Sequence, residues 1–253
     1  MIKKWSSPLV SCLILLLAQL LERGVSAADV LKVGVTAQLP PMIYKEGGNL
    51  AGVEADFSKE LGEELGRPVK LVEVNWEDQI PALIEGRTDI IMSGMSITRA
   101  RQIRVAFTTP YLSMGQGVLV RRENANRYIL GFPARPDGTI GVMKATTGDY
   151  LVQQEFPGVK KKEFKTAAEA AKALEKKKID LLICDLPIVW WLAGMHEAEG
   201  LVVVPILLSQ EQLAWAVRKS DGELLDSANK ALAKMQSDGR ANAIIKRWIP
   251  LYK

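Results

Sequence analysis

Apolar runs of strand length alternate with amphipathic runs of helix length over the first third of the chain. The run 30–37, VLKVGVTA, has the composition of a strand, and 53–66 carries apolar residues at near-helical spacing and ends in glycine, a common helix stop. A strand over 69–74, a helix over 76–86 and a strand over 88–94 continue the series. This order predicts a parallel sheet with helices on both faces.

The same rhythm returns after a turn indicated by the residues PDG. The predicted elements are a strand over 138–145, helices over 148–156 and 166–178, a strand over 179–185, a helix over 186–194 and a strand over 200–208. Thr166 can cap the second helix, because Glu169 follows three residues on. The chain then extends over 211–219 and closes with two helices between about 221 and 249.

These two blocks predict an α/β protein with two lobes, each a mostly parallel sheet flanked by helices, and a cleft between them. We place lobe 1 at residues 28–118 plus 217–253 and lobe 2 at 119–216. The closing helices go to lobe 1 because the first block has fewer helices of its own. The two crossings, near 115–121 and 209–217, would form a two-stranded hinge.

The first 27 residues have the pattern of a signal peptide. Lys3 and Lys4 precede an apolar run over 8–21, and small residues stand at 25–27, which predicts cleavage after Ala27. The run is shorter than the roughly 20 apolar residues of a membrane span, which disfavours an uncleaved anchor. A lipoprotein signal at Cys12 is also disfavoured, because little apolar sequence precedes it. We therefore expect a periplasmic protein that is exported by a cleavable signal peptide.

Charge, cysteine and histidine counts narrow the chemistry. The chain carries a net charge of +4, of which residues 1–27 contribute +2, so no strong basic patch indicates nucleic-acid binding. The lysine runs 160–162 and 176–178 are interpreted as solvated surfaces of helices or turns. Cys184 is alone after residue 27, which excludes an intrachain disulfide. His196, the single histidine, lies in AGMHEAEG, a predicted exposed helix end, so we expect no metal site, catalytic role or cofactor.

Polar groups follow the predicted strands at their carboxyl ends, where open α/β sheets bind ligands. The strand over 88–94 leads to Met95, Ser96 and a short helix that Thr98 can cap, and Arg101 projects from the first turn of that helix. A guanidinium can make two parallel hydrogen bonds to a carboxylate. The alternative is that the arginines here only cover a surface helix.

The second block offers two matching groups. Thr146 and Thr147 follow a strand at a helix N-terminus, which favours an anion, although an ordinary N-cap explains them as well. Asp185 directly follows an apolar strand, where it would accept a hydrogen bond from a ligand ammonium or cap the next helix. In the first block, Leu39, Met42 and Trp76 would form an apolar wall, or simply core. Together the groups have the charge pattern of an α-amino acid.

The chain resembles the type 2 periplasmic solute-binding proteins that serve polar amino-acid ABC transporters, solute-binding protein family 3. The most specific motif is GRTDIIMSGMSITRARQIRVAFTTPY, and GVEADFSKELGEELG, WEDQIPALIEG and IDLLICD follow the family's order and spacing. The resemblance covers essentially all of the chain after the signal. It implies the periplasmic binding protein type II fold, a small amino-acid ligand, capture by lobe closure, delivery to an inner-membrane permease, and a monomer.

The resemblance also implies roles for individual residues. Arg101 would bind the ligand α-carboxylate, helped by hydroxyl and backbone groups of the turn before it and by Thr147 with Thr146 from the second lobe. Asp185 would accept from the α-ammonium. The turn residues are Gly94, Met95 and Ser96.

Departures from the family pattern bear on specificity. Where relatives often carry an aspartate and an aromatic residue in the first loop, this chain has Thr36 and Leu39. The missing carboxylate argues against a cationic ligand side chain, and Gly94 in place of a turn serine makes the site less polar. We therefore expect a neutral amino acid, with Trp76 as the remaining aromatic wall.

Two other functions fit the same scaffold. Some relatives are cyclohexadienyl dehydratases, for which Asp185 or Glu54 would be the acid, but no second acid–base group is evident. The chain would also serve as a ligand sensor for a membrane partner. Formation of product from a cyclohexadienyl acid would indicate the enzyme, and a neighbouring permease and ATPase would indicate transport.

Overall fold

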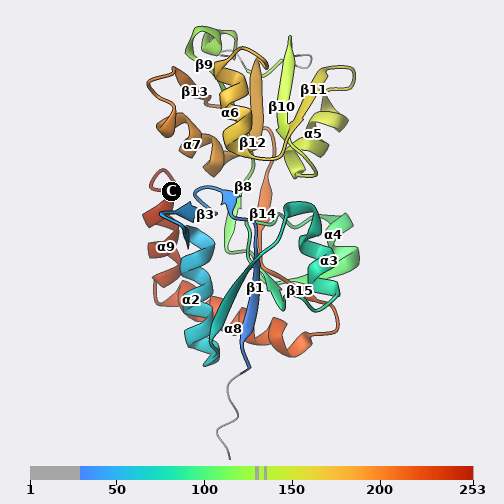
Figure 1. The fold of residues 1–253 in the computed structure, drawn as a ribbon, viewed down its shortest axis with the longest axis vertical. Helices are drawn as coiled ribbons and strands as arrows, with labels where there is room; N and C mark the ends of the chain where they lie inside the picture. Colours follow the sequence, from blue (N-terminus) through green and yellow to red (C-terminus); the bar gives the residue numbers. More distant parts are fainter. Residues whose placement is uncertain (1–28, 129–130, 134–135, 253) are drawn as a thin grey trace, which may run out of the picture.

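The computed structural model describes residues 29–128, 131–133 and 136–252, and the predicted signal peptide lies outside them. The chain forms two α/β lobes stacked along the long axis of the molecule (Figure 1). Each lobe is built on a five-stranded sheet with helices on its faces. The two-lobed α/β architecture expected from the alternating pattern is therefore confirmed.

The sheet of the first lobe has the order β5-β1-β6-β15-β7. The strands β5, β1 and β6 are mutually parallel, and β15 runs antiparallel to both β6 and β7, so four of the five strands point the same way. The bounds are β1 Leu31–Val35, β5 Val69–Glu73, β6 Ile90–Ile91, β7 Val105–Phe107 and β15 Ala216–Arg218.

The second lobe repeats this plan in the order β11-β10-β12-β9-β13. Here β9 is the reversed strand, antiparallel to β12 and β13, while β10 is parallel to β11 and β12. Each lobe thus takes its one reversed strand from a segment that has just crossed from the other lobe. The bounds are β9 Gln116–Arg121, β10 Thr139–Met143, β11 Lys160–Phe164, β12 Leu181–Asp185 and β13 Leu201–Val204.

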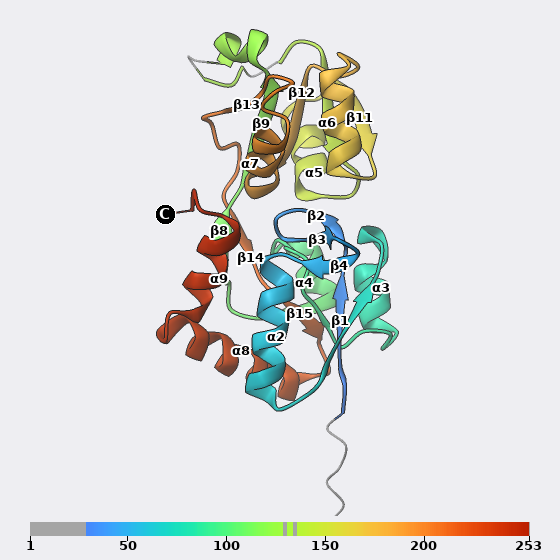
Figure 2. The same ribbon diagram turned by 60° about the vertical axis from the view of Figure 1, so that its left-hand side comes forward.

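The predicted helices are found, with ends that differ by a few residues. In the first lobe they are α2 Val53–Leu65, the 3-10 turn η1 Trp76–Asp78, α3 Gln79–Ile84 and α4 Arg99–Arg104; α8 Gly222–Ser237 and α9 Arg240–Trp248 pack on α2 (Figure 2). In the second lobe they are α5 Thr147–Glu155, α6 Ala167–Glu175 and α7 Leu186–Met195, and a 3-10 turn that was not predicted, η2 Arg122–Tyr128, follows β9. Gly66 ends α2 in the left-handed conformation, and Thr166 caps α6 through the backbone N–H of Glu169, as their positions in the sequence predict.

A small three-stranded antiparallel sheet at the edge of the first lobe was not expected. The strands β2 Gln38–Leu39, β3 Ile43–Glu46 and β4 Asn49–Ala51 pair antiparallel, and Gly47 and Gly48 turn the chain with φ values of +57° and +86°. The strands are too short for their alternation to stand out, and prolines interrupt the segment. Figure 2 shows this small sheet at the face of the first lobe that points toward α5 and α7.

The interpretation of the lysine run 160–162 as a helix or turn surface was wrong. These residues form β11, the edge strand of the second sheet, in parallel register with β10. Lysines are common on edge strands because their charge discourages further pairing. The other run, 176–178, is an exposed turn after α6, as predicted.

A short two-stranded ribbon joins the lobes. Strands β8 Leu112–Met114 and β14 Glu211–Leu213 pair antiparallel, and they lie between the two sheets (Figure 1). The ribbon begins three residues before the first predicted crossing, 115–121, because the residues from Gln116 on already belong to the second sheet. The second predicted crossing, 209–217, contains β14 and the first residues of β15.

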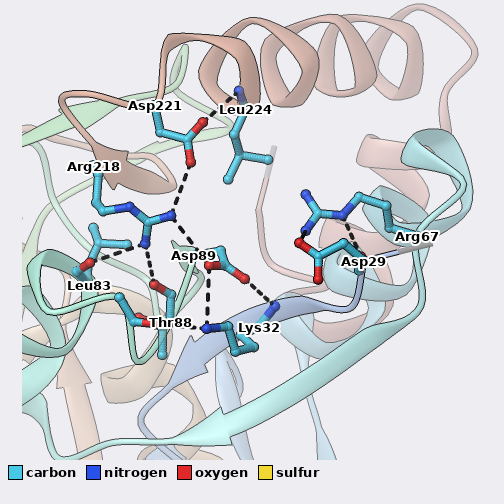
Figure 3. A network of polar contacts seen from close by, with 10 residues as sticks. Asp29, Lys32, Arg67, Leu83, Thr88, Asp89, Arg218, Asp221 and Leu224 are labelled. Atoms are coloured by element: carbon cyan, nitrogen blue, oxygen red, sulfur yellow. Dashed lines mark hydrogen bonds and ion pairs between the residues drawn. The ribbon is translucent and has the colours of Figure 1, made fainter. Parts of the chain in front are cut away.

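Arg218 anchors the returning chain at the base of the first lobe (Figure 3). Its guanidinium donates to the carbonyl oxygens of Thr88 at 2.7 Å and Leu83 at 3.3 Å, and it pairs with Asp89 and Asp221. Asp89 also accepts the backbone N–H of Lys32 at 2.9 Å. The network ties β15 to β1 and to the start of β6, so the two parts of the lobe that are distant in sequence form one unit.

Among the residues that the structure describes, no helix combines the length and apolar character needed to cross a membrane.

Candidate functional site

A small cavity lies between the lobes, beside the ribbon, and residues of both lobes line it. Its volume is about 10 Å³, enough for about one water. Eight of the nine predicted site residues line this cavity, and the ninth, Met95, lines a larger adjoining cleft. The lining residues are Leu39, Trp76, Gly94, Ser96, Arg101, Met143, Thr146, Thr147, Cys184, Asp185 and Ile188.

The turn after β6 positions Arg101. Thr98 caps α4 by accepting the backbone N–H of Arg101 at 3.2 Å, which places this arginine in the first turn of the helix. The guanidinium folds back to donate to the carbonyl oxygen of Ser96 at 2.8 Å, and its Cζ lies 5.2 Å from the ring centroid of Trp76. Burial lowers the pKa of Arg101, while the carboxylates of Asp185 and Glu211 act in the opposite direction. Arg101 therefore lines the cavity, and it is not simply an exposed arginine on a surface helix.

A buried carboxylate under the turn holds Gly94. Glu54, at the start of α2, accepts the backbone N–H of Gly94 and the hydroxyl of Tyr111, both at 2.6 Å, and the indole N–H of Trp215 at 3.1 Å. Gly94 has a φ of +65°, a conformation that favours glycine. Glu54 does not line the cavity. Glu54 therefore supports the structure of the turn from below the cavity wall.

Thr146 and Thr147 have different roles. Thr146 is the N-cap of α5: its Oγ1 accepts the backbone N–H of Asp149 at 3.4 Å and donates to the carbonyl oxygen of Met143 at 2.7 Å. The alternative of an ordinary N-cap thus holds for this residue, although it also lines the cavity. Thr147 accepts a hydrogen bond from Gln116 Nε2 at 3.1 Å.

Asp185 occupies the N-cap position of α7 but makes no side-chain cap hydrogen bond. Its carboxylate instead accepts a short hydrogen bond from Gln116 Nε2 and lines the cavity. Burial and, to a smaller degree, the negative charge of Glu211 raise the pKa of Asp185 to about 6. Asp185 therefore does not cap α7 through its side chain, and its carboxylate faces the cavity.

Sequence reasoning missed two polar residues of the site, Gln116 and Glu211. Gln116 begins β9, is 1% exposed, and links Thr147 and Asp185 to Glu211. Glu211 begins β14 and lines the adjoining cleft. Both come from the crossing segments, which were predicted as chain connections only. The one available signal was a glutamine between two glycines in an apolar run, GQG.

Trp76 touches both lobes. Its indole N–H donates to the carbonyl oxygen of Ala145 at 2.9 Å, and next to it Glu77 pairs with Lys144 at 2.9 Å. Ala145 has a φ of +59°, unusual for a residue other than glycine. A second contact between the lobes joins Tyr44 of β3 to Trp191 of α7, with ring centroids 5.0 Å apart. The lobes thus meet at more than one contact.

The larger cleft opens beside the cavity, with a volume of about 1080 Å³. Arg101, Trp76 and Thr147 line both spaces, so the cleft and the cavity adjoin. On the first lobe the cleft is bounded by α3 and α4, and on the second by α5. A ligand with its backbone groups at Arg101 and Asp185 would have room for its side chain in this direction.

Three other predicted positions lie elsewhere. Thr36 points away from the cavity, since its hydroxyl donates to the carbonyl oxygen of Val74 at 2.9 Å, and Met42 is core, packed under the Gly94 turn. His196 ends α7 but is half-buried rather than exposed, because its Nδ1 contacts the carboxylate of Glu175. Among the described residues, Glu175, His196 and Glu199 form a group with metal-ligating atoms, away from the cavity.

Comparison with models of protein families identifies the family to which this chain belongs. The model of the bacterial extracellular solute-binding proteins, family 3, matches residues 31–250. The chain belongs to this family. Among curated relatives, the L-cystine-binding protein TcyJ of Escherichia coli is 26% identical over 234 residues, covering 92% of this chain and 85% of TcyJ.

Solved structures of similar proteins agree with the two-lobed fold. The ancestral amino acid-binding protein AncCDT-1, a precursor of cyclohexadienyl dehydratase, is 33% identical with a TM-score of 0.78, and the match covers 92% of this chain and 99% of that one. A binding component of an ABC transporter from Wolinella succinogenes, complexed with lysine, is 30% identical with a TM-score of 0.80, covering 87% and 96%.

Proposed function

We propose that this family 3 protein captures a small amino acid with a neutral side chain by lobe closure and delivers it to the permease of an ABC transporter. The observation that supports this proposal best is that one cavity is lined both by Arg101 of the first lobe and by Asp185 of the second lobe. A guanidinium there can pair with an α-carboxylate, and a carboxylate can accept from an α-ammonium. A ligand held by both residues would bridge the lobes.

The size of the cavity supports a mechanism that includes opening. A space of about 10 Å³ is far smaller than an amino acid, so a ligand enters only when the lobes separate. The ribbon of β8 and β14 is the narrow connection about which we expect this movement. Ligand contacts available only in the closed form would then shift the population toward it.

Two residues of the first loop support a ligand with a neutral side chain. Thr36 stands where relatives often carry an aspartate, and its hydroxyl donates to the carbonyl oxygen of Val74 instead of facing the cavity. Leu39, in place of an aromatic residue, lines the cavity with an apolar side chain. Relatives are named for the binding of cystine, glutamine and arginine, so the family accommodates several side chains. We propose a periplasmic monomer that carries out no catalysis and uses no cofactor.

The test is a thermal-shift panel of the chain from residue 28 on against the twenty L-amino acids. A ligand at 100 times its dissociation constant adds about 2.7 kcal/mol of stability. One or a few neutral amino acids should raise Tm in the wild type and not in Arg101→Ala. Arg99→Ala, an exposed arginine of the same helix that lines neither cavity, is the matched control and should respond like wild type. Absence of any shift would refute the amino-acid assignment.

A dehydratase is the second candidate, favoured by one observation. Asp185, with a pKa raised to about 6, has the character of a general acid, and one structural neighbour is described as a precursor of cyclohexadienyl dehydratase. Incubation with a cyclohexadienyl acid should leave its absorbance unchanged if binding is the function. Appearance of an aromatic product would favour the enzyme.

A further inference from the structure

We propose that Glu211, in the ribbon between the lobes, is a second carboxylate of the ammonium site and restricts the ligand to carboxylates that carry an α-amine. The inference rests on the proposed function, because it assumes that an amino acid binds between Arg101 and Asp185. Glu211 would then be a specificity-determining residue contributed by the connecting segment, and the ligand group that it recognises is the α-ammonium.

Glu211 is held firmly at the junction of the two lobes. Its Oε1 accepts hydrogen bonds from the hydroxyl of Ser209 at 2.7 Å and from Gln116 Nε2 at 3.1 Å. Its Oε2 accepts from the hydroxyl of Ser96, a residue 2% exposed in the first-lobe turn, at 2.5 Å. A hydrogen-bonded and half-buried carboxylate has a fixed position, as recognition of a ligand group requires.

The neighbourhood of Glu211 has more acceptors than donors. The Gln116 amide has two hydrogens, yet its Nε2 faces Thr147 Oγ1, Asp185 and Glu211. The amide oxygen of Gln116 is also buried, and it has no hydrogen-bond partner among the described residues. Two carboxylates therefore share one neutral amide, and the other donors to Glu211 are the neutral hydroxyls of Ser96 and Ser209. An ammonium, with three donors and a positive charge, is the group that this arrangement lacks.

The charges around Glu211 also favour binding of an ammonium group there. Glu211 contributes to raising the pKa of Asp185, and both carboxylates act on Arg101. The guanidinium of Arg101 already donates to the carbonyl oxygen of Ser96, and it lies at the carboxylate end of the proposed ligand. An α-hydroxy acid or α-keto acid of the same shape would leave Asp185 and Glu211 without a cation, which is costly in a buried site.

The position of Glu211 also connects recognition with the ribbon. Glu211 pairs with Met114 across the ribbon, and Gln116 follows Met114 by two residues. An ammonium bound by Asp185 and Glu211 would thus touch the second lobe and the crossing segment together. A ligand without the amine loses this link, so amine recognition and lobe closure depend on the same group.

The experiment compares amine recognition in four purified proteins: wild type, Glu211→Gln, Glu211→Asp and Glu155→Gln. Glu155 lines the same cleft but lies outside the hydrogen-bond network, so it is the matched control. The probes are the neutral L-amino acids and, for each that binds wild type, the α-hydroxy acid with the same side chain. Dissociation constants are measured by calorimetry, with the hydroxy acid as a competitor.

We expect Glu211→Gln to weaken amino-acid binding by about tenfold or more and to change hydroxy-acid binding by less than about threefold. Glu211→Asp, which keeps the charge, should retain most of the preference for the amine, and Glu155→Gln should match wild type. Equal weakening of both probe types, or amino-acid binding by Glu211→Gln within about threefold of wild type, overturns this inference alone. Failure of wild type to bind any amino acid overturns the proposed function together with it.

Discussion

The indole N–H of Trp76 in the first lobe donates to the carbonyl oxygen of Ala145 in the second, at 2.9 Å. The donor belongs to the turn before α3, and the acceptor belongs to the turn between β10 and α5. The same ring lies under the guanidinium of Arg101. One side chain therefore contributes both to the wall of the cavity and to the contact between the lobes, and the contact exists only when the lobes are close together.

Replacing Trp76 with phenylalanine should weaken the closed form. The change keeps an aromatic wall but removes the hydrogen bond, whose net value is about 0.5–1.5 kcal/mol. Affinity for the amino acid should fall about two- to tenfold, measured by calorimetry, because less of the protein occupies the binding-competent state. Trp190→Phe, on α7 and outside both cavities, is the control. Unchanged affinity of Trp76→Phe would mean that the Ala145 contact does not contribute to closure.

The regular elements could be predicted because long apolar periodicities identify them. The helix over 53–66 and the strand over 179–185 appear as α2 and β12 with small differences at their ends. The strand β11 could not be recognised, because an edge strand made of KKKEF has the composition of a surface. The short strands β2 to β4 have too few residues to show a period.

The candidate site was predictable only in part, for a physical reason. Arg101, Thr147 and Asp185 follow strand ends, so a general rule about open sheets finds them. Gln116 and Glu211 join the site through the crossing segments, and their placement depends on how the two lobes are stacked. No local pattern contains that information. The capping role of Thr146 was likewise an open alternative until its hydrogen bonds were known.

Replacing Glu54 with glutamine should change how stability depends on pH. Burial raises the pKa of Glu54 from 4.5 to about 7, although its three hydrogen bonds act to lower it. A carboxyl group whose pKa is higher in the folded state favours folding most below pH 4.5, and this contribution is lost as the pH rises through 7. Between pH 5 and pH 8, wild type should lose about 2–3 kcal/mol relative to Glu54→Gln.

Chemical denaturation at several pH values measures this difference in the free energy of unfolding. Glu63→Gln is the matched control, since Glu63 is an exposed glutamate of the same helix. Its stability curve should run parallel to that of wild type. A constant difference between wild type and Glu54→Gln over this range would contradict a titrating Glu54.

Replacing Asp185 with asparagine should stabilise the free protein while removing ligand binding. The pKa of Asp185 is raised from 3.8 to about 6, so its contribution to stability is full below pH 3.8 and lost as the pH rises through 6. At pH 8 the buried charge therefore opposes folding, and Asp185→Asn should raise the free energy of unfolding by about 1–3 kcal/mol. An unchanged or lower stability at pH 8 would show that Gln116 already compensates the charge.

The thiol of Cys184 provides a direct probe of lobe opening. It lines the cavity at 4% exposure, burial raises its pKa, and it is the only cysteine after residue 27. A thiol reagent reaches it only while the lobes are apart, so a saturating amino acid should slow its labelling about tenfold. In a Cys184→Ser background, Lys178→Cys places a thiol on an exposed turn, and its labelling rate should not respond to the amino acid. Labelling of Cys184 at the same rate with and without the amino acid would contradict capture by lobe closure, even if the amino acid binds.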